Sequence, residues 1–98
     1  MKFVDILIQV FIKGKNILIE TLAEQAHESW SGWMRYLFTN SIQNDDGSIT
    51  IPEHLVKRWK RQMYTRYNDL PENEKYSDRN EANKIIDKIK LFMEIKND

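Results

Sequence analysis

The chain of 98 residues contains no cysteine, three glycines, two prolines and only two histidines. Without cysteine it has no disulfide scaffold, no thiolate metal site and no cysteine nucleophile. His27 and His54 are too few and too scattered for a zinc site. A chain free of cysteine fits a reducing compartment, so we predict a cytoplasmic protein with no metal and no cofactor.

The chain also lacks an excess of one charge, because 15 Lys and Arg balance 15 Asp and Glu. This balance argues against nucleic acid as a partner. The apolar run from Phe3 to Ile12 is interrupted by Asp5 and Gln9 and is too short for a bilayer, and no small-residue cleavage site follows it. We therefore predict no signal peptide and no membrane partner, and expect this run to form a core or a homo-oligomer contact. An interfacial helix is the alternative.

What the chain does contain is typical of one folded domain, since 41% of residues are hydrophobic and 31% are charged. We predict a single domain over residues 1–98. Residues 1–15 form an apolar N-terminal helix or oligomerisation segment, and Gly14 and Asn16 separate it from a helical core over residues 17–95. Within this core, apolar residues recur at three- and four-residue steps from Leu18 to Leu37, which predicts a helix over residues 17–38.

The rest of the chain divides at its turn signals. Asp46-Gly47 between isoleucines predicts a short β-hairpin or loop near residues 40–51. Pro52 opens a second helix, and Pro71 begins a third whose expected core stripe is Ala82, Ile85, Ile86, Ile89, Phe92 and Met93. The expected fold is mainly all-α, with three to four antiparallel helices and this one hairpin.

The segment from Pro52 to Arg66 is the most distinctive part of the sequence. Five cations lie in it beside aromatic residues, and no acid occurs from His54 to Asn68. Guanidinium groups bind oxyanions in a fork and indole faces stack on planar groups, so this pattern favours an anionic, planar ligand. The alternative is a solvated helix face with Trp59 turned into the core.

Catalytic motifs are not recognisable. His27-Glu28 is not followed by a second histidine four residues on, so the zinc-protease helix motif fails. Gly14, Gly32 and Gly47 do not form a phosphate-binding loop, and no Ser-His-Asp arrangement is apparent. We predict that the protein is not an enzyme.

Several motifs occur in an order that resembles the RyR repeat, a small helical module of ryanodine receptors and of stand-alone bacterial and phage proteins. The similarity covers about residues 22–89. Its motifs are LAEQAHESW (Leu22 to Trp30), Gly32-Trp33, Asp45-Asp46, Pro52-x-x-Leu55-Val56 and Tyr67-x-x-Leu70-x-x-x-x-Lys75-x-Ser77-x-Arg79. The resemblance implies a binding module, encoded by a phage and acting in the host cell cytoplasm.

Two functions follow as expectations. The first is non-catalytic sequestration of a small anionic, nucleotide-like molecule, to counter host defence. The alternative is direct inhibition of a host defence protein through the same basic and aromatic side chains, which are typical of interface hot spots. The predicted ligand-binding residues are His27, Trp30, Trp33, Arg58, Trp59, Arg61, Arg66, Tyr67 and Arg79, and packing of the tryptophans in the core is the competing interpretation.

Overall fold

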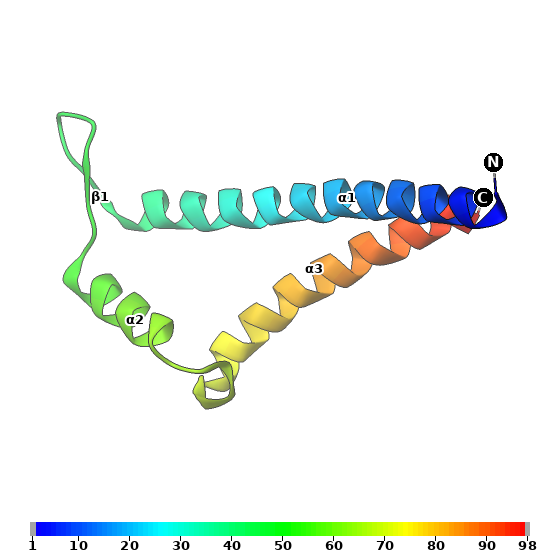
Figure 1. Cartoon of the computed structure of the whole chain (residues 1–98). Coiled ribbons are helices and arrows are strands. Elements are labelled where there is room, and N and C mark those ends of the chain that lie inside the picture. Colours follow the sequence, from blue (N-terminus) through cyan, green and yellow to red (C-terminus); the bar gives the residue numbers. More distant parts are fainter. Residues whose placement is uncertain (1, 98) are drawn as a thin grey trace. The chain divides into compact units, whose positions relative to one another are not determined.

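The structure is a computed structural model that describes residues 2–97, with side chains described for residues 2–94. Its elements are α1 (Phe3–Asn40), β1 (Ile42–Gln43), β2 (Ile49–Thr50), α2 (Glu53–Met63), the 3-10 helix η1 (Tyr67–Asp69) and α3 (Glu72–Asn97), as Figure 1 shows. The prediction of a mainly α-helical fold with one short hairpin is confirmed.

Helix α1 is continuous through the point where we predicted a break. It has 38 residues and includes Gly14 and Asn16. One glycine in a helix interior costs about 1 kcal/mol. The flanking Lys13 and Lys15 are good helix formers, and the many other residues of so long a helix also offset this cost. At its C-terminal end, the Ser41 hydroxyl donates to the Leu37 carbonyl at 2.7 Å. This bond satisfies one of the last four carbonyls of α1.

The hairpin pairs Ile42 with Thr50 and Gln43 with Ile49 in antiparallel register. Its loop is longer than a two-residue turn and contains Gly47 with a φ of 89°, which glycine adopts without strain. The Asp46 carboxylate accepts hydrogen bonds from the Ser48 hydroxyl at 2.6 Å and from the Ser48 amide at 2.9 Å. These bonds lower the pKa of Asp46, and they stabilise the turn around Gly47.

Both prolines lie just outside helices. Pro52 precedes α2, and its carbonyl accepts from the amides of Leu55 and Val56. Pro71 precedes α3, and its carbonyl accepts from the amides of Glu74 and Lys75. We expected each proline to be the first helical residue, and each helix instead starts one position later, because the proline carbonyl accepts the first helical bond.

The chain divides into two compact units. The first contains α1 up to Ser29 and α3 from Glu81 onward. Its two helices are antiparallel, because Ser29 bonds to Glu81 while the earlier Glu24 pairs with the later Lys88 at 3.5 Å. The second unit runs from Trp30 to Asn80, and contains the end of α1, the hairpin, α2, η1 and the start of α3.

The interior of each unit is small. Leu55 is the buried apolar residue of the second unit, and Phe92 is that of the first, where Gln25 is also buried. The expected core stripe of the last helix is therefore wrong except at Phe92, since its other members are exposed. Within the described residues, one antiparallel neighbour covers one side of α3, which leaves the rest of its apolar residues in solvent.

Candidate functional site

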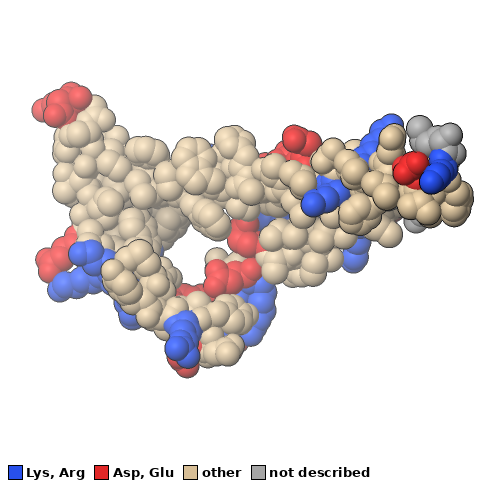
Figure 2. Space-filling model, viewed as in Figure 1, with Lys and Arg blue, Asp and Glu red and all other residues tan. Residues whose placement is uncertain are grey.

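The basic and aromatic side chains predicted from the sequence belong mostly to the second unit. Trp30 and Trp33 lie one turn apart on α1, and both are more than half exposed. Their exposure contradicts the interpretation that they fill the core. On α2, Trp59 is half-buried while its neighbour Arg58 is exposed. Lys and Arg side chains gather over α2, and the hairpin tip carries acidic residues (Figure 2).

Arg58 is held by a residue that sequence reasoning missed. Its Nη2 donates a hydrogen bond to the Tyr36 hydroxyl at 2.8 Å. The Tyr36 ring in turn contacts the Trp59 ring, with centroids 6.4 Å apart and planes inclined by 59°. Tilted ring pairs of this kind are favourable, so the three side chains support one another. We call Tyr36, Arg58 and Trp59 the Arg58 cluster. The only sequence signal for Tyr36 was its position one turn after Trp33 on the same side of α1.

The charge of Arg58 has no carboxylate partner among the described residues, unlike the charges of Arg61 and Arg79. Arg58 makes no ion pair with any residue whose side chain the structure describes, because its hydrogen bond goes to a neutral hydroxyl. The same holds for Arg66, which is exposed at the start of η1. Of the four predicted arginines, Arg58 and Arg66 therefore remain open to an anion from solution, as does Arg35, which is exposed on α1 and forms no ion pair with a described residue.

Arg61 and Arg79, by contrast, are bound to carboxylates. Arg61 pairs with Glu74 on α3, and Arg79 pairs with Glu72 at 3.2 Å. The pKa of Arg79 is raised mainly by its hydrogen bond to Glu72, and to a smaller extent by Tyr67. An anion would have to compete with these carboxylates, so Arg61 and Arg79 are weaker candidates than the sequence suggested.

Glu74 is a second residue that the sequence did not mark. Its side chain is only 12% exposed, and the hydrogen bond from Arg61 is the main cause that lowers the pKa of Glu74. The Gln62 amide and then Arg58 lower the pKa of Glu74 further. Oε1 of Glu74 has no hydrogen-bond partner among the described residues. Sequence reasoning did not pair Glu74 with Arg61, because nothing links positions 61 and 74 before the chain folds.

Tyr67 contacts a cation of α3 and is not part of the Arg58 cluster. Lys75 Nζ lies 5.8 Å from the centroid of the Tyr67 ring, which is a cation–π contact. His27 belongs to the first unit and is exposed. Two of the nine predicted residues, Arg58 and Trp59, both contact Tyr36. Two others, Tyr67 and Arg79, interact with each other, and this interaction raises the pKa of Arg79.

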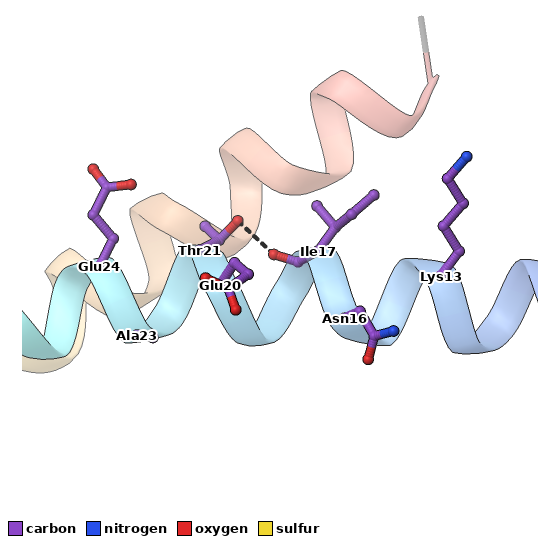
Figure 3. Close-up of a pocket in the computed structure, with 7 residues that line it drawn as sticks. All are labelled: Lys13, Asn16, Ile17, Glu20, Thr21, Ala23 and Glu24. Carbon is purple, nitrogen blue, oxygen red and sulfur yellow. Dashed lines mark hydrogen bonds between the residues drawn. The ribbon is translucent and has the colours of Figure 1, made fainter.

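A shallow depression lies elsewhere, on α1 of the first unit (Figure 3). None of the predicted residues lines it; its lining residues are Lys13, Asn16, Ile17, Glu20, Thr21, Ala23 and Glu24. It is open, built on a single helix, and contains two carboxylates against one ammonium group. An anion would be repelled there, so we assign the candidate site to the Arg58 cluster.

The chemistry available at the Arg58 cluster is that of recognition. The pKa shifts at Asp46, Glu74, Glu81 and Arg79 all favour the charged form at neutral pH, so none of these four groups is poised to transfer a proton there. Within residues 2–97, no three His, Asp or Glu side chains gather as metal ligands would. Guanidinium groups and aromatic faces remain, which bind anions and planar rings.

The chain matches no protein-family model, no curated protein and no solved structure. The resemblance to RyR repeats therefore remains a prediction that rests on the motif residues. Among the described residues, no helix has the length and apolar character needed to cross a bilayer.

Proposed function

We propose that the Arg58 cluster binds a small anionic, nucleotide-derived molecule without changing it chemically, and that this binding sequesters a host defence signal for a phage. The observation that carries the proposal is the exposed Arg58 guanidinium. The Tyr36 hydroxyl orients it, and no carboxylate of the residues whose side chains are described forms an ion pair with it. An oriented guanidinium loses less freedom when it binds an oxyanion in a fork.

Aromatic side chains close to Arg58 supply the second part of the recognition. Trp59 lies next to Arg58 in sequence and contacts Tyr36, while Trp33 is exposed one turn before Tyr36. Stacking of one base on an aromatic ring contributes about 1–3 kcal/mol, and a hydrogen bond from a charged group about 1.5–3 kcal/mol. One stack and two charged bonds are enough for micromolar affinity after the cost of association.

The test uses the purified protein and a panel of AMP, ADP, cyclic AMP and a cyclic dinucleotide. Thermal unfolding should shift upward with at least one of them, because a ligand at about a hundredfold over its dissociation constant adds about 2.7 kcal/mol. Arg58→Ala should weaken that binding by about tenfold or more. Lys57→Ala is the matched control, since Lys57 is exposed on the same helix and its charge is paired with Glu53 at 2.9 Å.

Equal affinities for the wild type, Arg58→Ala and Lys57→Ala would refute the assignment to Arg58. Mass spectrometry of small molecules released on denaturation would identify a ligand that the panel omits. Arg61→Ala is a poor probe of binding, because it removes the partner of the nearly buried Glu74 and should lower stability directly.

Direct inhibition of a host defence protein is a second candidate, and one observation favours it. Tyr64, at the end of α2, is 82% exposed, and Met63 beside it is also exposed. Tyrosines at such positions contribute strongly to protein interfaces. If this function holds, the nucleotide panel gives no shift, a host protein is captured, and Tyr64→Ala abolishes capture without lowering the melting temperature.

A further inference from the structure

The Tyr36 hydroxyl uses only half of its hydrogen-bonding capacity. It accepts a hydrogen bond from Arg58 Nη2 at 2.8 Å, and among the residues whose side chains are described no acceptor takes its own proton. A phenol hydroxyl accepts one hydrogen bond and donates another at the same time. Because the Tyr36 side chain is 48% exposed, this proton is available to a group that arrives from solution.

Arg58 also keeps most of its donors free. A guanidinium carries five N–H donors in a planar arrangement, and neighbouring N–H groups point the same way as a fork. The bond to Tyr36 occupies one hydrogen of Nη2 and leaves the neighbouring N–H of that fork without a partner among the described residues. This N–H lies beside the Tyr36 hydroxyl, so the two can each bind one oxygen of the same anion.

We propose that Tyr36 is itself a ligand-binding residue, and that its hydroxyl and the Arg58 guanidinium together bind one terminal phosphate group. This inference rests on the function proposed above, and it names the part of the ligand that the Arg58 cluster recognises. One phosphate oxygen accepts from the free N–H of Arg58, and a second accepts from the Tyr36 hydroxyl. The existing bond between the two side chains closes this ring of hydrogen bonds.

A terminal phosphate fits the pair better than a phosphodiester does. It carries three strong acceptor oxygens and a charge of about −1.5 to −2 at neutral pH. A diester has two free oxygens and a single charge, so it gains less from the unpaired charge of Arg58. The nearby carboxylate of Glu74 does not cancel this charge, because Glu74 is bonded to Arg61 instead.

The fold holds the two donors in place. Tyr36 belongs to α1 and Arg58 to α2, and both lie in the second unit. The Tyr36 ring contacts the ring of Trp59, which is half-buried. Tyr36→Phe keeps this ring contact and removes only the hydroxyl, so the variant tests the hydroxyl without removing the support of the site.

The first experiment is a titration with inorganic phosphate, followed by NMR at two atoms of the wild type. The Arg58 Nε signal is identified by its absence in Arg58→Ala, and the Tyr36 Cζ signal by its absence in Tyr36→Phe. Both signals should move over the same range of phosphate concentrations, because Cζ reports the hydrogen bond that the hydroxyl donates. If Tyr36 only orients Arg58, the Arg58 signal moves alone.

The second experiment compares affinities. Tyr36→Phe should raise the dissociation constant for phosphate about tenfold, because it removes one hydrogen bond to a charged group. Tyr76→Phe is the matched control, since it deletes the same atom from a tyrosine that is 64% exposed on α3, and it should bind as the wild type does. AMP, which has a terminal phosphate, should bind more tightly than cyclic AMP, which has a diester.

The outcomes separate this inference from the proposed function. Phosphate that moves both signals while no nucleotide binds would refute the proposed function and leave the inference standing. Nucleotide binding that is equally tight in Tyr36→Phe and the wild type would do the reverse. A Tyr36 signal that phosphate does not move would overturn the role of the hydroxyl, and cyclic AMP that binds as tightly as AMP would overturn the terminal phosphate.

Discussion

Ser29 connects the two helices of the first unit through a short chain of hydrogen bonds. Its hydroxyl accepts from the Gln25 side chain at 3.2 Å and donates to the Glu81 carboxylate at 2.5 Å. Gln25 is only 4% exposed, which makes it the buried polar residue of this unit. Substituting Ser29 with Ala removes both bonds and changes little else, because the side chains differ by one oxygen atom.

The expected loss of stability follows from what each partner loses. Gln25 retains a buried amide donor without its acceptor, a change that costs about 1–3 kcal/mol. Glu81 loses a hydrogen bond to a charged group, but its side chain is a quarter exposed, so water replaces part of that bond. Ala also gains a few tenths of a kcal/mol in helix propensity. We therefore expect Ser29→Ala to lower the free energy of unfolding by about 2 kcal/mol, or roughly 10 °C in melting temperature.

The same bond makes the effect depend on pH. The hydrogen bond from Ser29, and then the one from Lys84, lower the pKa of Glu81 from its usual 4.5. A carboxyl group with a lowered folded-state pKa stabilises the protein above its unfolded-state pKa and loses that contribution as pH falls through the folded-state value. The difference in melting temperature between the wild type and Ser29→Ala should therefore be largest near neutral pH and smaller at about pH 3.

Thermal and urea unfolding followed by circular dichroism measure this effect. Ser77→Ala is the matched control, since Ser77 is exposed on α3. A double-mutant cycle with Glu81→Gln should give a coupling energy of about 1 kcal/mol or more between positions 29 and 81. The reasoning fails if Ser29→Ala is no more destabilising than Ser77→Ala, or if the two substitutions of the cycle are additive.

Three further predictions concern the second unit. Glu74→Gln should lower the melting temperature at neutral pH. The difference in melting temperature between this variant and the wild type should vanish as pH falls through the lowered pKa of Glu74, because Arg61 then has no charged partner in either protein. A difference that is constant with pH would contradict this. Gly32→Ala should raise the free energy of unfolding by about 0.5–1 kcal/mol in urea titrations, since an added Cβ has no atom within 4 Å; a lower value would reveal a close neighbour. Gly47→Ala should lower it by about 1 kcal/mol and shift the hairpin amide resonances, since its φ of 89° is unfavourable for alanine; unchanged spectra would contradict this.

Local signals in the sequence predicted the elements well, because each depends on neighbouring residues. Asp46-Gly47 marked the hairpin, and Pro52 and Pro71 marked the starts of α2 and α3 to within one residue. The break expected at Gly14 was wrong, because the cost of one glycine is small against a helix of 38 residues. A glycine ends a helix when its neighbours also favour a turn, and the lysines beside Gly14 do not.

Burial and pairing were not predictable in the same way. Apolar spacing placed Ile85, Ile86 and Ile89 in a core stripe, yet spacing shows only that residues share a face and not whether another element covers it. For the candidate site, the basic segment was visible in the sequence, but the division of its arginines was not. Arg61 is bound by Glu74 while Arg58 is left to a tyrosine, and that difference arises from contacts between separate helices.

The small interior has a consequence for how this chain can change during evolution. Among the residues whose side chains are described, only Gly14, Gln25, Leu55 and Phe92 are buried. Substitutions at exposed positions usually alter stability by less than about 0.5 kcal/mol. Exposed positions that make no contact between helices are therefore free to diverge by nearly neutral steps, and selection on the fold of the protomer acts through the few buried positions and through polar contacts such as that of Ser29.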